Sequence, residues 1–190
     1  GCMSSKVAKL VGAYREHISV PWAGGLAAIQ RVIFAVYDKT DELRLRAHID
    51  EFRLATLEAG HEWLLLDVTN AFPEWMAAQE YRDAYFECPE DLTGYQAGEI
   101  TEFVHGLVER IKATITAEAT PNTVVALMGV GSLFGLARVS SVVEGIKDAV
   151  GGRLVVFFPG EYHPENHAYR LLDARDGWNY LAVPLLAKEA

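Results

Sequence analysis

The sequence has only two cysteines among its 190 residues, Cys2 and Cys88. Two cysteines cannot build a disulfide framework, and alone they cannot complete a zinc site, so a reducing compartment is favoured. Long apolar segments are missing too, because the longest run, near Leu154 to Phe158, is far shorter than the roughly 18 residues of a membrane span. The chain also lacks a basic-then-apolar leader. We therefore expect it in the cytoplasm and not at a membrane.

Basic residues are scarce as well. The chain has 17 Lys and Arg against 26 Asp and Glu, a net charge of −9, and no run of basic residues. Because proteins that bind duplexes displace counterions with basic side chains, this balance disfavours direct nucleic-acid binding. Hydrophobic residues at 51% and charged residues at 23% are typical of a globular protein. No internal repeat or long linker divides the chain, so we predict a single domain over residues 1–190.

Several catalytic motifs are absent. No Gly-Lys-Ser or Gly-Lys-Thr triplet occurs, so the chain lacks the phosphate-binding loop of nucleotide hydrolases, and we predict no ATP hydrolysis. Neither a G-x-S-x-G elbow nor an HExxH motif is present. His163 and His167 have the spacing of a helical metal pair, but Pro164 lies between them. We expect a solvated loop there, and we predict no catalytic residue, metal site or cofactor.

The sequence does contain apolar runs with the character of strands. Four of them are RVIFAVYD (31–38), HEWLLLDV (61–68), TVVALMGVG (123–131) and RLVVFFPGEY (153–162), and a weaker fifth is WNYLAVPLL (178–186). The first four are nearly continuous instead of alternating, which is typical of parallel strands that are covered on both faces.

Helical patterns lie between these runs. Leu45, Ile49 and Phe52 recur at helical spacing before Gly60, and Pro73 and Pro89 bracket a short aromatic helix. Two further apolar stripes run from Ile100 to Ile115 and from Val139 to Val150. Strands that alternate with helices predict an α/β fold with three layers, in which helices flank a parallel or mostly parallel sheet of about five strands.

Ligands of open parallel sheets bind beyond the carboxyl ends of the strands. The candidate ligand-binding residues at those ends are Asp38, Asp67, Gly129, Gly131, Glu161 and Tyr162. If the first four strands are parallel, the three carboxylates share one edge and form a metal or acid/base cluster. The alternative is structural, with Asp38 capping the next helix and Asp67 bracing its turn through Thr69 or Asn70. The stretch GVGSLFG (129–135) likewise predicts either a phosphate cradle or a tight turn.

Two stretches, MGVGSLFGLARVSSVVEGI (128–146) and RLVVFFPGEY (153–162), resemble the BrxB family, whose members are components of BREX phage-resistance systems. The resemblance implies a sheet like that of P-loop proteins with the phosphate-binding loop missing. It also implies an accessory role beside an ATPase, a DNA methyltransferase and a phosphatase-like subunit, with Arg138, Glu161 and Tyr162 as binding candidates. Structurally, Arg138 is instead expected to pair with Glu161. The sequence departs from the family at Gly135, where a proline is common, and in the HPENH segment.

The leading hypothesis is a non-catalytic assembly subunit of a phage-defence complex that binds other protein subunits. Aromatic residues crowd the segment between Pro73 and Gly98, and aromatics commonly anchor interfaces, so the candidate interface residues are Trp75, Tyr81, Tyr85, Phe86 and Tyr95. The alternative for this segment is that it folds over the protein's own core. The alternative for the whole protein is an enzyme or a small-ligand or nucleotide-binding protein that uses the carboxyl edge of the sheet. The oligomeric state stays open.

Overall fold

The computed structural model describes residues 5–78, 100–172, 174–177 and 182–187. Its centre is a sheet with the strand order β2-β3-β4-β1-β7, and these five strands run parallel. Their bounds are Val32–Tyr37 for β1, Glu62–Asp67 for β2, Thr123–Met128 for β3, Arg153–His163 for β4 and Val183–Leu185 for β7. The predicted α/β fold with a mostly parallel sheet is confirmed.

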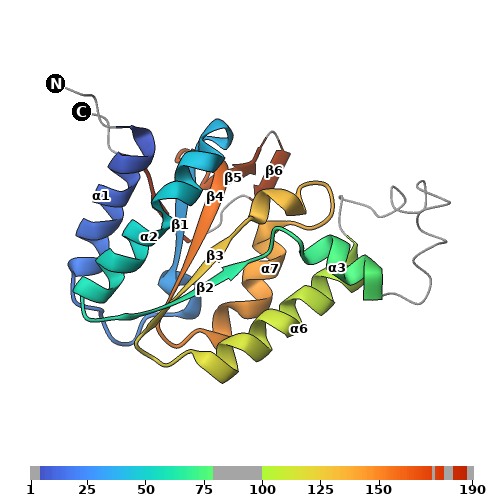
Figure 1. Ribbon diagram of the computed structural model, residues 1–190, viewed down its shortest axis with the longest axis horizontal. Helices are drawn as coiled ribbons and strands as arrows, with labels where there is room; N and C mark the ends of the chain where they lie inside the picture. Colours follow the sequence, from blue (N-terminus) through green and yellow to red (C-terminus); the bar gives the residue numbers. More distant parts are fainter. Residues whose placement is uncertain (1–4, 79–99, 173, 178–181, 188–190) are drawn as a thin grey trace.

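Helices cover both faces of this sheet (Figure 1). One face carries α1 (Lys6–Ser19) and α2 (Glu42–Glu58), and the other carries α3 (Ala71–Ala78), α6 (Thr101–Glu118) and α7 (Val139–Ile146). Side chains alternate along each central strand, so Phe34 of β1 packs towards α6 and α7 while its neighbour Ala35 packs towards α1 and α2. The three layers are therefore held by two apolar clusters that share the same strands.

The connections leave the sheet on opposite faces. From β1 the chain passes through α2 to the far edge at β2, and it returns to β3 and β4 through α6 and α7 on the other face. Short 3₁₀ turns begin two of these connections, at Lys39–Asp41 after β1 and at Val130–Leu133 after β3. A reversal of this kind opens a crevice at the carboxyl ends of the strands, which is where α/β sheets bind ligands.

Three details of the sequence interpretation need correction. The apolar run of β2 predicted a strand covered on both faces. β2 instead lies at the edge of the sheet and is only partly buried, because an edge strand has a neighbour on one side alone. The segment after Tyr162 is no open loop: β4 continues to His163 and forms an antiparallel arm with β5 (Ala168–Leu171) and β6 (Ala174–Gly177). Helix α3 begins at Ala71, so Pro73 lies in its first turn, where the missing N–H has no intrahelical acceptor to lose.

Among the described helices, none combines the length and the apolar character that crossing a bilayer requires. Within the same residues, no group of three or more His, Cys, Asp and Glu side chains is arranged to hold a metal ion.

Candidate functional site

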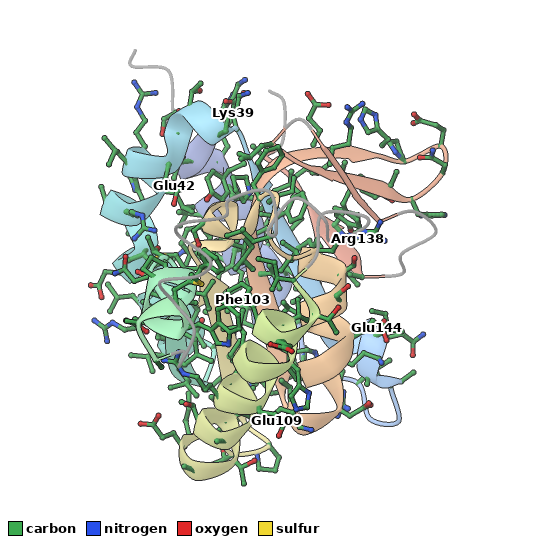
Figure 2. All side chains as sticks on the ribbon, turned by 90° about the vertical axis from the view of Figure 1, so that its right-hand side faces the viewer. Lys39, Glu42, Phe103, Glu109, Arg138 and Glu144 are labelled. Carbon is green, nitrogen blue, oxygen red and sulfur yellow. The ribbon has the colours of Figure 1, made fainter. Side chains whose placement is uncertain are left out.

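A cavity of about 400 Å³ lies at the carboxyl ends of β1, β3 and β4. Its walls come from the turns after β1, β2 and β3, from β4 and from the end of β5. The lining residues are Lys39, Glu42, Arg46, Thr69, Gly129, Gly131, Ser132, Pro159 and Leu172. The cavity thus occupies the crevice at the point where the chain connections change faces. Figure 2 shows two of its residues, Lys39 in the 3₁₀ turn before α2 and Glu42 at the start of α2.

Arg46 joins the elements around this cavity. Its Nε donates to Glu42 Oε1 at 3.1 Å, its Nη1 to Asp67 Oδ2 at 3.2 Å, and its Nη2 to Thr69 Oγ1 at 2.7 Å. A planar guanidinium is well suited to hold several acceptors in fixed directions. Helix α2 is therefore fastened to the turn after β2, and the charge of Arg46 is matched by these two carboxylates.

The contacts beside the cavity determine the ionisation of two groups, Asp67 and Tyr37. Burial acts to raise the pKa of Asp67, but hydrogen bonds from Thr69 and Arg46 outweigh it and lower that pKa. Burial raises the pKa of Tyr37, and the hydrogen bond from the Tyr37 hydroxyl to Glu42 raises it further. Asp67 is thus an anion that pairs with Arg46, and Tyr37 is a neutral donor.

The turn after β3 approaches the turn after β2 very closely. Gly129 has φ +83°, and a Cβ at this position would lie 2.3 Å from Thr69 Oγ1 and 2.5 Å from Asp67 Oδ1. Ser132 Oγ lies 2.8 Å from Gly129 O and 3.1 Å from Val68 O, so its hydroxyl also links the two turns. Gly129 therefore has a packing reason to be glycine, in agreement with the tight-turn interpretation of GVGSLFG.

The far wall of the cavity carries backbone strain. Leu172 has φ 56°, a conformation that L-residues other than Asn and Asp seldom adopt, and its N–H donates to Pro159 O at 2.9 Å. Gly160 lies beside it, and a Cβ there would come within 1.8 Å of Arg170 O. The antiparallel β4–β5 pair is thus tightly packed and places Leu172 in the wall of the cavity.

The three carboxylates of the sequence hypothesis do not form one cluster. Asp38 accepts hydrogen bonds from the Thr40 N–H at 2.8 Å and from its hydroxyl, so it caps the turn after β1 and lines a separate cavity beside α1. Asp67 accepts from the Thr69 N–H at 3.0 Å, as its structural alternative predicted. Glu161 lies beyond the parallel part of β4, in the antiparallel arm, where it is 67% exposed and 3.3 Å from His163 Nε2.

The remaining sequence candidates lie away from the cavity. Tyr162 is paired with Tyr169 in the arm, and its hydroxyl is 3.1 Å from His167 Nδ1. Arg138 immediately precedes α7, at the helix start labelled in Figure 2. Its pairing with Glu161 stays a prediction. The register of the arm sets Arg170 directly opposite Glu161.

Of the candidate interface aromatics, the structure describes Trp75. This ring packs on Phe72 and Phe103, with centroid distances of 5.9 and 5.7 Å, and it belongs to the cluster under α6. Trp75 thus follows the alternative in which the segment folds over its own core. The other four, Tyr81, Tyr85, Phe86 and Tyr95, lie outside the described residues.

Sequence reasoning did not identify Lys39, Arg46, Ser132, Pro159 and Leu172 as parts of the site. Arg46 had a local signal in its helical spacing from Glu42, and Ser132 and Pro159 lay within the GVGSLFG and RLVVFFPGEY stretches. The assembled geometry holds three turns in place around a cavity that has a lysine at one side and an apolar leucine at another.

Comparison with known proteins gives one match. The family model described as BREX protein BrxB matches residues 66–185, from the end of β2 to the end of β7. No curated protein and no solved structure shows significant similarity to this chain. The matched region includes both stretches that resembled the family in sequence and most turns of the cavity. The chain therefore belongs to the BrxB family of BREX proteins.

Proposed function

We propose that this protein is a non-catalytic accessory subunit of a BREX phage-defence complex, and that it holds another subunit through the open edge of β2. Membership of the BrxB family indicates a role in a BREX system. The edge of β2 supports the finer part of the proposal, because it offers backbone groups and apolar side chains to a partner.

The hydrogen-bond pattern determines which groups of β2 face outwards. Glu62 donates its N–H to Asn122 O at 3.0 Å, and Val68 donates its N–H to Met128 O at 2.9 Å, so the even-numbered residues bond to β3. Backbone groups alternate in direction along a strand, and those of Trp63, Leu65 and Asp67 therefore point away from β3. No strand of the described residues pairs with this side of β2.

Within the part of the chain that the structure describes, the middle of this edge lacks the usual protection, and charged residues stand only at its ends, Glu62 and Asp67. Exposed edges commonly carry lysine, proline or a bulge that prevents pairing with another chain, whereas β2 reads EWLLLD and pairs with β3 in continuous register. Leu65 is 36% exposed, and Leu57 of α2 is 46% exposed. Leu57 lies three turns after Arg46 and hence on the stripe of α2 that reaches β2.

A groove continues the surface on the other side of the strand. Its volume is about 200 Å³, and it lies between β2, α3 and α6, with Leu66, Leu107 and Ile111 among its lining residues. An extended segment that adds to a sheet edge gains main-chain hydrogen bonds, and its alternate side chains fill such pockets. The fitting partner is thus an extended, partly apolar segment of another subunit.

The test is Leu65→Lys, which adds a charge to the edge and leaves the β2–β3 hydrogen bonds intact. We expect the folded variant to lose at least about tenfold in affinity for its BREX partner, measured by titration with the purified subunits of the same system. Leu54→Lys is the matched control, because Leu54 is 42% exposed on the outer face of α2. Equal affinities of wild type and the Leu65 variant would refute binding at this edge.

The cavity at the carboxyl edge supports a second candidate function, the binding of a small polar ligand. The observation in its favour is the strained Leu172 in the cavity wall, since unusual backbone conformations often occur at binding sites. Thermal unfolding in the presence of nucleotides, with Lys39→Ala as the comparison, tests it.

We expect no ATP turnover, because phosphoryl transfer needs a lysine and a metal-bound hydroxyl at the phosphates. Turnover that Gly131→Asp abolishes would contradict this.

A further inference from the structure

Two arginines lie side by side at the amino end of the sheet, opposite the cavity. Arg31 ends the 3₁₀ turn before β1, and Arg153 is the first residue of β4. The parallel register pairs Val32 with Leu154, so the residues that precede them are neighbours on adjacent strands. Parallel strands are about 4.8 Å apart, so the backbones of the two arginines lie close together, and the charge of Arg31 acts on Arg153.

Arg153 is 8% exposed, and its guanidinium lies 4.7 Å from the centre of the Trp22 ring. Trp22 in turn stacks on His61, with ring centroids 3.6 Å apart, and His61 Nδ1 is 2.6 Å from Asn122 Oδ1. The stack holds the guanidinium in a fixed place, and Arg153 Nη1 donates to Gly152 O at 3.1 Å.

Neither arginine has a carboxylate partner among the described residues. Arg31 Nη1 donates only to Gly151 O, at 3.4 Å, and Arg31 Nε is buried without a hydrogen-bond acceptor. Asp148 lies on the 3₁₀ turn that contacts the turn of Arg31. Its ion pair, however, is with Lys147, whose Nζ is 3.9 Å away. Arg31 is half-buried and Arg153 is buried, and buried arginines are nearly always paired, because an unmatched buried charge is strongly destabilising.

The same surroundings lower the pKa values of Arg153 and His17. Burial lowers the pKa of Arg153, and the charge of Arg31 lowers it further. Burial also lowers the pKa of His17 in the last turn of α1, and the charge of Arg153 adds to this effect. The chain as a whole has nine more negative than positive charges, yet none of the carboxylates in the described ranges pairs with these two arginines.

We infer that Arg31 and Arg153 form a binding site for a single oxyanion, the carboxylate or phosphate group of a ligand or partner. Two guanidinium groups whose hydrogen bonds go to the backbone carbonyls of Gly151 and Gly152 have further N–H donors that fit the oxygen atoms of such a group. The inference is independent of the β2 edge.

The test compares thermal unfolding of the full chain in chloride, phosphate and acetate at equal ionic strength. We expect phosphate or acetate to raise the Tm of the wild type by about 3 °C or more over chloride. Phosphate stabilises most proteins by exclusion from their surface, so the informative quantity is the difference between the wild type and Arg31→Gln. Arg31→Gln should lose most of the shift, Arg31→Lys should keep part of it, and Arg44→Gln, a remote exposed control, should keep it all.

The two anions distinguish the two sources. A larger shift in phosphate identifies a phosphate-bearing ligand, and a larger shift in acetate identifies an acidic side chain or a chain terminus. In chloride alone, Arg31→Gln should be at least as stable as the wild type, because it removes the repulsion with Arg153. Equal anion shifts in the wild type and Arg31→Gln would overturn the inference, as would an Arg31→Gln variant that is destabilised equally in all three salts.

Discussion

At the scale of single residues, the carboxyl edge shows which site features a sequence contains. Asp38 and Asp67 each bond to a threonine two positions later, so their structural roles could be predicted from local turn chemistry. Arg46 could not be assigned in this way, because its partner Asp67 is 21 positions away and meets it only in the folded chain. The same holds for Arg31 and Arg153, which become neighbours only through the β1–β4 register.

The glycines of the turn after β3 allow a direct test at this scale. Gly129→Ala should destabilise the protein by about 2–4 kcal/mol, because a left-handed φ and a close contact with the Asp67–Thr69 turn both act against a Cβ. Gly135 is the matched control: its φ is +78°, but a Cβ there meets nothing within 4 Å, so Gly135→Ala should cost about 1 kcal/mol. Urea unfolding measures both. Equal losses would mean that the turns have room for the methyl group.

At the scale of elements, the central strands could be predicted and the arm could not. β1 and β3 are buried at every position, as their continuous apolar runs predict. The apolar run of β2 also predicts a buried central strand, but β2 lies at the edge of the sheet. The position of a strand in the sheet depends on the strand order, which the amino acids of that one strand do not determine. β5 and β6 have four residues each, too few to show a period, so the arm was missed.

The arm is fixed to the sheet through Tyr169. Its buried hydroxyl donates to Ala182 O at 2.9 Å, just before β7, and its ring packs on Phe34 and Phe158. Tyr169→Phe should therefore cost about 1–3 kcal/mol, because it leaves a buried carbonyl without a donor, and hydrogen exchange in β7 should accelerate. Tyr162→Phe is the control, since that hydroxyl meets His167 at the surface and its loss should cost about 0.5 kcal/mol. If the two variants unfold alike, the arm is not anchored by this bond.

At the scale of the whole molecule, the two apolar clusters depend on each other. β1, β3 and β4 send alternate side chains to both faces, so neither cluster retains its shape when the other is lost. Such sharing favours one cooperative transition, which is the behaviour expected of the single domain that the sequence predicts.

The tryptophans provide reporters for the two faces separately. Trp63 packs on the cluster beside α1 and α2, whereas Trp75 packs on the cluster beside α6 and α7. Two variants, each with one of these as its sole tryptophan and phenylalanine at the other three positions, should unfold in urea with a fluorescence midpoint equal to their own far-ultraviolet circular dichroism midpoint. Comparing each variant with itself removes the effect of the substitutions on stability. If the Trp75 reporter changes at lower urea than the circular dichroism while the Trp63 reporter does not, the face of α6 and α7 opens on its own. The chain would then consist of two cooperative units that share one sheet.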